Sequence, residues 1–224
     1  MAEHFRWRSQ LSKGITIFAV IALLALGSGP ASAQVQPSKP QLPEKHYQAA
    51  RDALTRGDTD NAKLEAKLAL QDNPLDAAAH FLLASLLALQ GENDQAIVGF
   101  QRALTLDPTN PEALYNLGTL LLWRGEVLLA SRLLENAVSI RPVHVPSYNN
   151  LAKAYYLTGL PELAIGTYEE ALRRDPSNAI ALKNLAVLAE GAGLHEVATG
   201  YRRRLEALGL AQTALPAVEP ITLL

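Results

Sequence analysis

Three asparagines recur at a constant spacing along the chain, and their amides are groups that could bind a polypeptide backbone. They are Asn116 in "LYNLG", Asn150 in "YNNLA" and Asn184 in "LKNLA", each 34 residues after the one before. Asparagine is a mediocre helix former because its amide competes for nearby backbone groups. An amide offers both a donor and an acceptor, so each one could pair with a peptide unit of an extended ligand. The alternative is that each amide only bonds a neighbouring helix.

The histidines and the glycine-rich turn do not form a metal site or a phosphate-binding site. His46 and His80 also lie 34 residues apart, and helix packing would hold equivalent positions about 10 Å apart, too far for one metal ion. His144 and His195 have no partner close in sequence. The stretch "GAGLHE" follows no strand, so it reads as a helix–helix turn and not as a phosphate loop. The sequence therefore predicts a protein that is not an enzyme, with no catalytic residue, no metal site and no cofactor.

The same interval also governs proline, glycine and alanine. Between each recurring proline and the next recurring glycine, apolar residues follow the i, i+3, i+4, i+7 spacing of one helix face. The glycine supplies a left-handed residue that ends this first helix, and the proline stops a second helix. Asp76, Asn110 and Asn178 are expected to cap the next first helices. The recurring residues are Pro74, Pro108, Pro142 and Pro176, with Gly57, Gly91, Gly125, Gly159 and Gly193, and Ala62, Ala96, Ala130, Ala164 and Ala198.

This pattern resembles the tetratricopeptide repeat family. The fourth repeat matches best, with Tyr148, Leu151, Ala152, Tyr155, Gly159, Ala164, Tyr168, Ala171 and Pro176. The resemblance implies an all-α fold, a right-handed α-solenoid of about five helix-turn-helix repeats over residues 44–210. The repeats are placed near 43–76, 77–110, 111–144, 145–178 and 179–212. In the fifth repeat Arg202 replaces a packing aromatic, as expected of an end repeat with a polar outer face. In the fourth repeat the stretch "YEEALRR", residues 168–174, pairs carboxylates with cations at helical spacing and is interpreted as a solvated face.

In such a solenoid the first helices line the concave surface, and the asparagines form a ladder. It is similar to the asparagine ladder in the repeats of O-linked N-acetylglucosamine transferases, which holds extended protein substrates. The ladder is incomplete, because Gln48 and Leu82 occupy its position in the first two repeats. The groove would be more aromatic at one end and richer in amides and cations at the other, which suits a peptide with an acidic group at one end. The predicted groove residues are Asn116, Asn150, Asn184, Asn149, Lys153, Lys183, Tyr115, Phe81, Tyr47 and Arg51.

The amino-terminal segment predicts export. Arg6, Arg8 and Lys13 precede the apolar residues 15–26, and a small-residue A-x-A sequence ends at Ala33. This order is typical of a cleaved signal peptide. The 12 residues of the apolar stretch fall short of the ~20 that span a bilayer. Residues 1–33 are therefore expected to be removed, which places the protein in the periplasm or outside the cell. An uncleaved anchor in the inner membrane, facing the periplasm, is the alternative.

Composition narrows the partners. The net charge of −2 provides no basic field for nucleic acid, and the absence of cysteine excludes disulfides.

Residues 34–43 read as a Pro-rich linker, and residues 211–224 as an apolar tail that is loose, packs on the last helix, or docks into a groove of its own chain or a partner. The expected function is an exported scaffold, monomeric by preference, that binds a partner protein or extended peptide during assembly of a cell-envelope complex. A substrate-presenting accessory subunit of an envelope enzyme and a self-associating structural protein are the alternatives.

Overall fold

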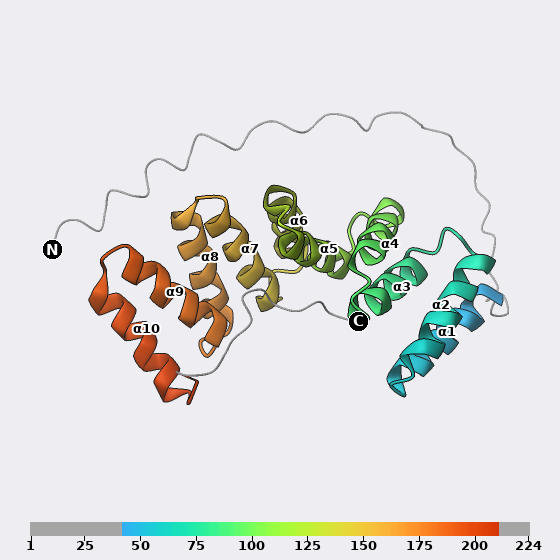
Figure 1. Ribbon diagram of the computed structural model, residues 1–224, viewed down its shortest axis with the longest axis horizontal. Helices are drawn as coiled ribbons and strands as arrows, with labels where there is room; N and C mark the ends of the chain where they lie inside the picture. Colours follow the sequence, from blue (N-terminus) through green and yellow to red (C-terminus); the bar gives the residue numbers. More distant parts are fainter. Residues whose placement is uncertain (1–41, 211–224) are drawn as a thin grey trace, which may run out of the picture. The chain divides into compact units, whose positions relative to one another are not determined.

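The computed structural model describes residues 42–210, which form ten α-helices and contain no strand (Figure 1). The predicted signal peptide, the apolar tail and residues 34–41 of the predicted linker lie outside the described residues. The first helix starts at Leu42, inside the last two residues assigned to that linker. The helices are α1 Leu42–Thr55, α2 Thr59–Asp72, α3 Ala77–Leu89, α4 Asn93–Leu106, α5 Pro111–Arg124, α6 Val127–Ile140, α7 Val145–Leu157, α8 Pro161–Arg174, α9 Ala179–Gly191 and α10 His195–Ala207.

A left-handed glycine follows the first helix of every repeat, as the sequence predicted. After α5, Gly125 has a φ of 86°, a conformation that costs glycine little and strains residues with a Cβ. The N–H of Gly125 donates to the carbonyl of Leu122 at 3.1 Å, and the N–H of Glu126 donates to the carbonyl of Leu121 at 2.9 Å. These bonds satisfy the last carbonyls of α5 and turn the chain towards α6.

Side-chain caps begin three of the first helices. The carboxylate of Asp76 accepts from the N–H of Ala79 at 3.0 Å at the start of α3. Asn110 and Asn178 cap α5 and α9 in the same way, each at 2.8 Å. All three were predicted from their place before an apolar run, and the structure confirms them. At the equivalent position before α7, His144 makes no side-chain cap bond to the described part of the chain.

The helices pack mainly on their neighbours in chain order. Each repeat pairs its two helices, and the second helix of one repeat packs on the first helix of the next. Glycines allow two of these pairs to approach closely: a Cβ added to Gly99 would lie 2.8 Å from Cβ of Ala84, and one added to Gly118 would lie 2.8 Å from Cγ of Leu134. The all-α fold of five helix pairs is confirmed. Within residues 42–210 no helix is long and apolar enough to cross a membrane.

Candidate functional site

The three recurring asparagines lie on one side of the first helices. Gly118 marks the side of α5 that meets α6, because a Cβ added there would lie 2.8 Å from Cγ of Leu134. Asn116 precedes Gly118 by two residues, which places it about 200° around the helix. Asn150 in α7 and Asn184 in α9 occupy the equivalent positions. We call the side of α5, α7 and α9 that carries these three amides the amide face.

One amide of this face bridges two repeats. Asn116 and Asn150 are buried, with 0% and 1% of their surfaces exposed, whereas Asn184 is half-buried. The amide nitrogen of Asn150 donates to Oγ1 of Thr119 at 2.9 Å and so links α7 to α5. The amide nitrogen of Asn184 donates to the carbonyl of Ile180 in its own helix, also at 2.9 Å. Asn150 therefore has the helix-bonding role that the sequence left as an alternative, and ligand binding by the amides stays a prediction.

Residues one position earlier hold the start of the next first helix. The ring of Tyr115 meets the ring of His144 edge to face, with centroids 4.8 Å apart and planes at 82°. The amide nitrogen of Asn149 donates to Oδ1 of Asn178 at 3.0 Å. His144 and Asn178 are the residues just before α7 and α9, so Tyr115 and Asn149 orient those helix starts. Sequence reasoning missed this role, although the constant separation of 29 residues could have indicated it.

The ten predicted groove residues divide evenly between the interior and the surface. Phe81 packs on Phe100 with ring centroids 5.7 Å apart, so the aromatic end of the predicted groove is largely interior. The guanidinium of exposed Arg51 lies 6.0 Å from the ring centroid of Tyr47. The surface group therefore consists mainly of cations. Buried are Phe81, Tyr115, Asn116, Asn149 and Asn150, while Tyr47, Arg51, Lys153, Lys183 and Asn184 are half-buried or exposed.

The bond between Asn150 and Thr119 should be measurable as a coupling in the free energy of unfolding. We expect a double-mutant cycle with Asn150→Ala and Thr119→Ala to give a coupling of about 1 kcal/mol, the usual net value of one such hydrogen bond. Urea denaturation followed by circular dichroism measures it. Asn184→Ala is the matched control, because the bond from its amide stays within its own helix. An equal loss in Asn150→Ala and Asn184→Ala, with no coupling to Thr119, would contradict the bridging role.

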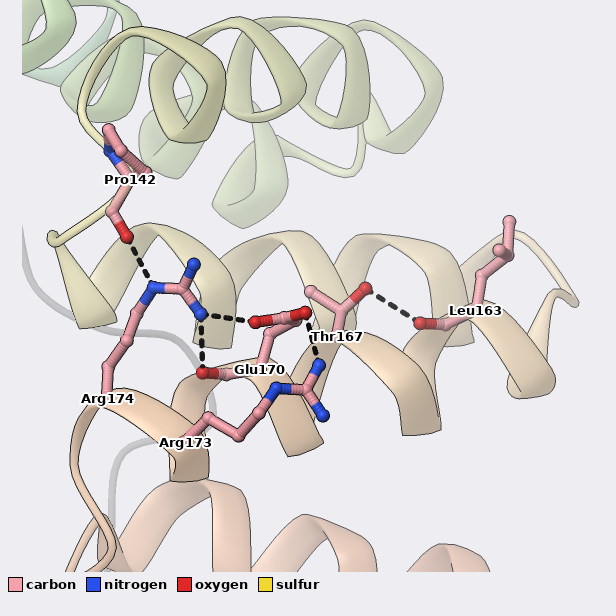
Figure 2. A network of polar contacts seen from close by, with 6 residues as sticks. All are labelled: Pro142, Leu163, Thr167, Glu170, Arg173 and Arg174. Carbon is pink, nitrogen blue, oxygen red and sulfur yellow. Dashed lines mark hydrogen bonds and ion pairs between the residues drawn. The ribbon is translucent and has the colours of Figure 1, made fainter.

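An arginine cluster clamps the junction between the third and fourth repeats (Figure 2). Arg174 at the end of α8 donates through Nε to the carbonyl of Pro142 and through Nη1 to the carboxylate of Glu170. Its guanidinium lies 4.1 Å from the ring centroid of Tyr148 in α7, a cation–π distance. Hydrogen bonds from Arg173 and Arg174 lower the pKa of Glu170 to about 2. The stretch read from sequence as a solvated face therefore also joins two repeats.

His144 should make stability depend on pH. Burial lowers its pKa below the usual 6.5, the nearby Arg141 lowers it further, and Glu112 opposes both effects. The folded state therefore disfavours the imidazolium, so stability present above pH 6.5 is lost as the pH falls through the lower folded pKa. We expect His144→Asn to reduce the loss of unfolding free energy between pH 7.5 and pH 5, measured by urea midpoints. An unchanged pH dependence in this variant would contradict the prediction.

A second surface exposes leucines beside the turns after α5 and α7. Leu128 is 71% exposed, and Leu129 and Leu157 are also exposed. Together with Val127 they line an open hollow of about 570 Å³. Exposed apolar side chains that gather around one hollow are typical of interaction surfaces. Sequence reasoning missed this surface, because these leucines belong to none of the recurring rows.

Comparisons with known proteins agree with this architecture. A crystal structure of MamA is 26% identical to this chain, covering 76% of this chain and 96% of that one with a TM-score of 0.66. PilF of Pseudomonas aeruginosa is 24% identical, covering 78% and 77% with a TM-score of 0.65. YrrB, described as a TPR protein with an unusual peptide-binding site, is 19% identical, covering 77% and 88% with a TM-score of 0.67. The last two likenesses show the fold alone. No curated protein matches the sequence.

Family models match the repeats directly. A model described as TPR repeat matches residues 84–125. A second, described as tetratricopeptide repeat, matches residues 115–179 and 149–209. Together they span residues 84–209, more than half of the chain, and agree with the glycine turns, caps and helix pairs. The chain belongs to the tetratricopeptide repeat family.

Proposed function

We propose that this chain is an exported interaction scaffold, without catalytic activity, that binds an extended segment of a partner protein on its amide face during assembly of a cell-envelope complex. The observation that carries the proposal is the column of amides repeated on three successive first helices, Asn116, Asn150 and Asn184. The family also includes YrrB, a protein described by its peptide-binding site. Repeat arrays use such extended surfaces for binding because each repeat presents the same positions again.

The side chains around the amide column suit a backbone ligand that carries an acidic group. Amides can exchange hydrogen bonds with the N–H and C=O groups of an extended segment, whatever its side chains. Lys183 is exposed on α9 and Lys153 is half-buried on α7. The ammonium of Lys153 lies 5.5 Å from the ring centroid of Tyr156, which holds this charge near the amide face. A carboxylate of the ligand would meet these two lysines.

The test compares partners captured by crosslinking in cells. One variant carries Asn116→Ala, Asn150→Ala and Asn184→Ala, and the matched control carries Asn93→Ala and Asn136→Ala at exposed positions of α4 and α6. We expect the first variant to lose a defined set of partners that the control retains. Circular dichroism and a thermal scan establish that both variants are folded. If the folded triple variant keeps every partner, the amide face is not the binding surface.

Export has a separate test. The mass of the mature protein is expected to correspond to a chain that starts at Gln34, since the predicted signal peptide ends at Ala33. A mass that includes residues 1–33 would favour the anchored alternative. This result bears on location and leaves the binding proposal unaffected.

The exposed leucines favour self-association as a second candidate. The hollow lined by Leu128, Leu129 and Leu157 could receive an apolar side chain of a second copy. Sedimentation of the intact protein and of Leu128→Ser separates this candidate from the first. A dimer that dissociates in Leu128→Ser would support it, and a monomer in both would exclude it.

A further inference from the structure

The central helix α5 is buried around its whole circumference. Every residue from 113 to 122 is buried, including the polar side chains of Asn116 and Thr119, each 0% exposed. A helix in a layer of paired helices ordinarily keeps one polar face in solvent. Because α5 is buried all round, polypeptide must cover the side that faces away from its partner helix as well as the side that meets it. The main packing partners of α5 are α4, α6 and α7. Asn116 lies on the side turned away from α6, so the amide face of α5 is covered as well.

In α9, the first helix of the fifth repeat, the positions equivalent to those of the amide face of α5 are not covered by the described part of the chain. Val187, equivalent to Thr119, is 57% exposed, and Lys183, equivalent to Tyr115, is exposed too. Since α9 has no following repeat in the described residues, the lack of a neighbour accounts for part of this exposure. The burial of the recurring asparagines differs too, because Asn116 is fully buried and Asn184 is only half-buried. Each of the two lies in a helix that follows the first helix of a preceding repeat, α3 before α5 and α7 before α9. The cover thus lies over the middle repeats.

We propose that the carboxy-terminal tail, residues 211–224 of the same chain, lies extended across the amide face and must be displaced before a partner binds there. This inference rests on the proposed function for its regulatory consequence, but the docking itself does not. The tail starts directly after the described residues. Gly209, with a φ of 70°, turns the chain after α10, and the N–H of Leu210 donates to the carbonyl of Leu205 at 3.0 Å. The chain is thereby turned back at the end of α10.

The length of the tail is sufficient. An extended chain covers at most about 3.3–3.6 Å per residue, so 14 residues reach roughly 46–50 Å. Packed helices lie about 8–10 Å apart, and the tail can therefore pass the first helices of several repeats. Pro216 and Pro220 prevent a continuous helix and favour an extended backbone. An extended backbone presents the peptide groups that amides can bond.

The composition of the tail complements the face. Leu215, Val218 and Ile221 are large apolar residues that gain by leaving water. The single charged side chain of the tail is Glu219, and the half-buried Lys153 is the cation beside the amide of α7 in the covered middle repeats. The amide face suits an extended segment that carries one acidic group and is otherwise apolar. The chain carries such a segment at its own end.

The absence of cysteine from the sequence makes a direct accessibility experiment possible. Thr119→Cys places a single thiol on the covered face, and Val98→Cys, at an exposed position of α4, is the matched control. Each is made in the full chain with the natural tail and in a full chain carrying Leu215→Ser, Val218→Ser and Ile221→Ser. We expect the tail substitutions to raise the maleimide labelling rate of the Thr119→Cys thiol at least about tenfold, equivalent to about 1.4 kcal/mol, and to leave the Val98→Cys rate unchanged.

A synthetic peptide with the sequence of residues 211–224 provides the second measurement. We expect it to bind the tail-substituted full chain, to slow labelling of the Thr119→Cys thiol again, and to bind the natural chain at least about tenfold more weakly because the face is occupied. A scrambled peptide of the same composition is the control. Circular dichroism checks that each variant retains its helices.

The possible results separate the occupants. Slow labelling that tail substitution does not change overturns the proposal. Slow labelling that requires protein concentrations at which sedimentation shows a dimer assigns the cover to a second copy and also overturns it. Neither result touches the proposed partner binding, which is read from the asparagine variants. Conversely, loss of no partner in those variants, together with a displaceable tail, would leave the tail docked on a face that serves no partner.

Discussion

Replacing Phe100 with alanine is expected to lower the free energy of unfolding by about 3–5 kcal/mol, the usual cost of deleting a fully buried aromatic ring. Phe100 is 0% exposed and its ring packs on Phe81 at a centroid distance of 5.7 Å. Alanine would leave a cavity in the core that α3 and α4 share. Urea denaturation followed by circular dichroism measures the loss as a lower midpoint at an unchanged slope.

The fifth repeat supplies the matched control for this ring. Arg202 occupies the position of Phe100 three repeats later, is exposed, and pairs with Glu190 at 2.7 Å. Because an exposed ion pair contributes little, Arg202→Ala should change the free energy of unfolding by less than about 1 kcal/mol. Similar losses in Phe100→Ala and Arg202→Ala would mean that the equivalent positions are equally buried, against the structure.

Adding a methyl group at Gly99 is expected to destabilise the protein by up to about 2 kcal/mol, the balance of overpacking against helix propensity. The new Cβ would lie 2.8 Å from Cβ and 3.3 Å from Cα of Ala84, so α3 and α4 must move apart. Overpacking of this kind costs about 1–3 kcal/mol, and the better helix propensity of alanine offsets about 1 kcal/mol of it. Ala84→Gly in the same molecule removes the clash, so a double-mutant cycle measured by urea denaturation should show a favourable coupling.

Gly166 gives the opposite sign and serves as the control. It lies in α8, and nothing in the described part of the chain is within 4 Å of a Cβ added there. Gly166→Ala should therefore raise the free energy of unfolding by up to about 1 kcal/mol through helix propensity alone. If Gly99→Ala were also stabilising, the close approach of α3 and α4 would be wrong.

The sequence was sufficient to predict where the helices begin and end, because helix starts and ends depend on residues within about one turn of them. The glycine after α5, the asparagine before it and the proline in its first turn each act within one turn of chain. Their spacing therefore predicted the helix pairs and their order. The family resemblance added how successive pairs pack.

The site was less predictable because burial depends on what lies across each position. Tyr115 and Lys183 occupy the same position of the repeat, yet Tyr115 packs on His144 while Lys183 is exposed. Periodicity identifies such positions as equivalent and cannot tell which neighbour each one meets. Similarly, the sequence pattern shows Arg174 only as a cation on a solvated face, whereas the fold brings to its guanidinium the carbonyl of Pro142 from the preceding repeat and the ring of Tyr148 from the same repeat. Contacts between repeats were thus the part that sequence reasoning missed.

Because each helix packs mainly on the helices that adjoin it in the chain, most native contacts join residues close in sequence. Low contact order of this kind favours rapid folding, since little chain entropy is lost before a contact forms. Structure can start in any repeat pair and spread outward to both ends. The asymmetry between the fully covered α5 and the open α9 then sets a direction, with the middle repeats opening last and α10 first. Amide hydrogen exchange along the chain would display this order as a gradient of protection.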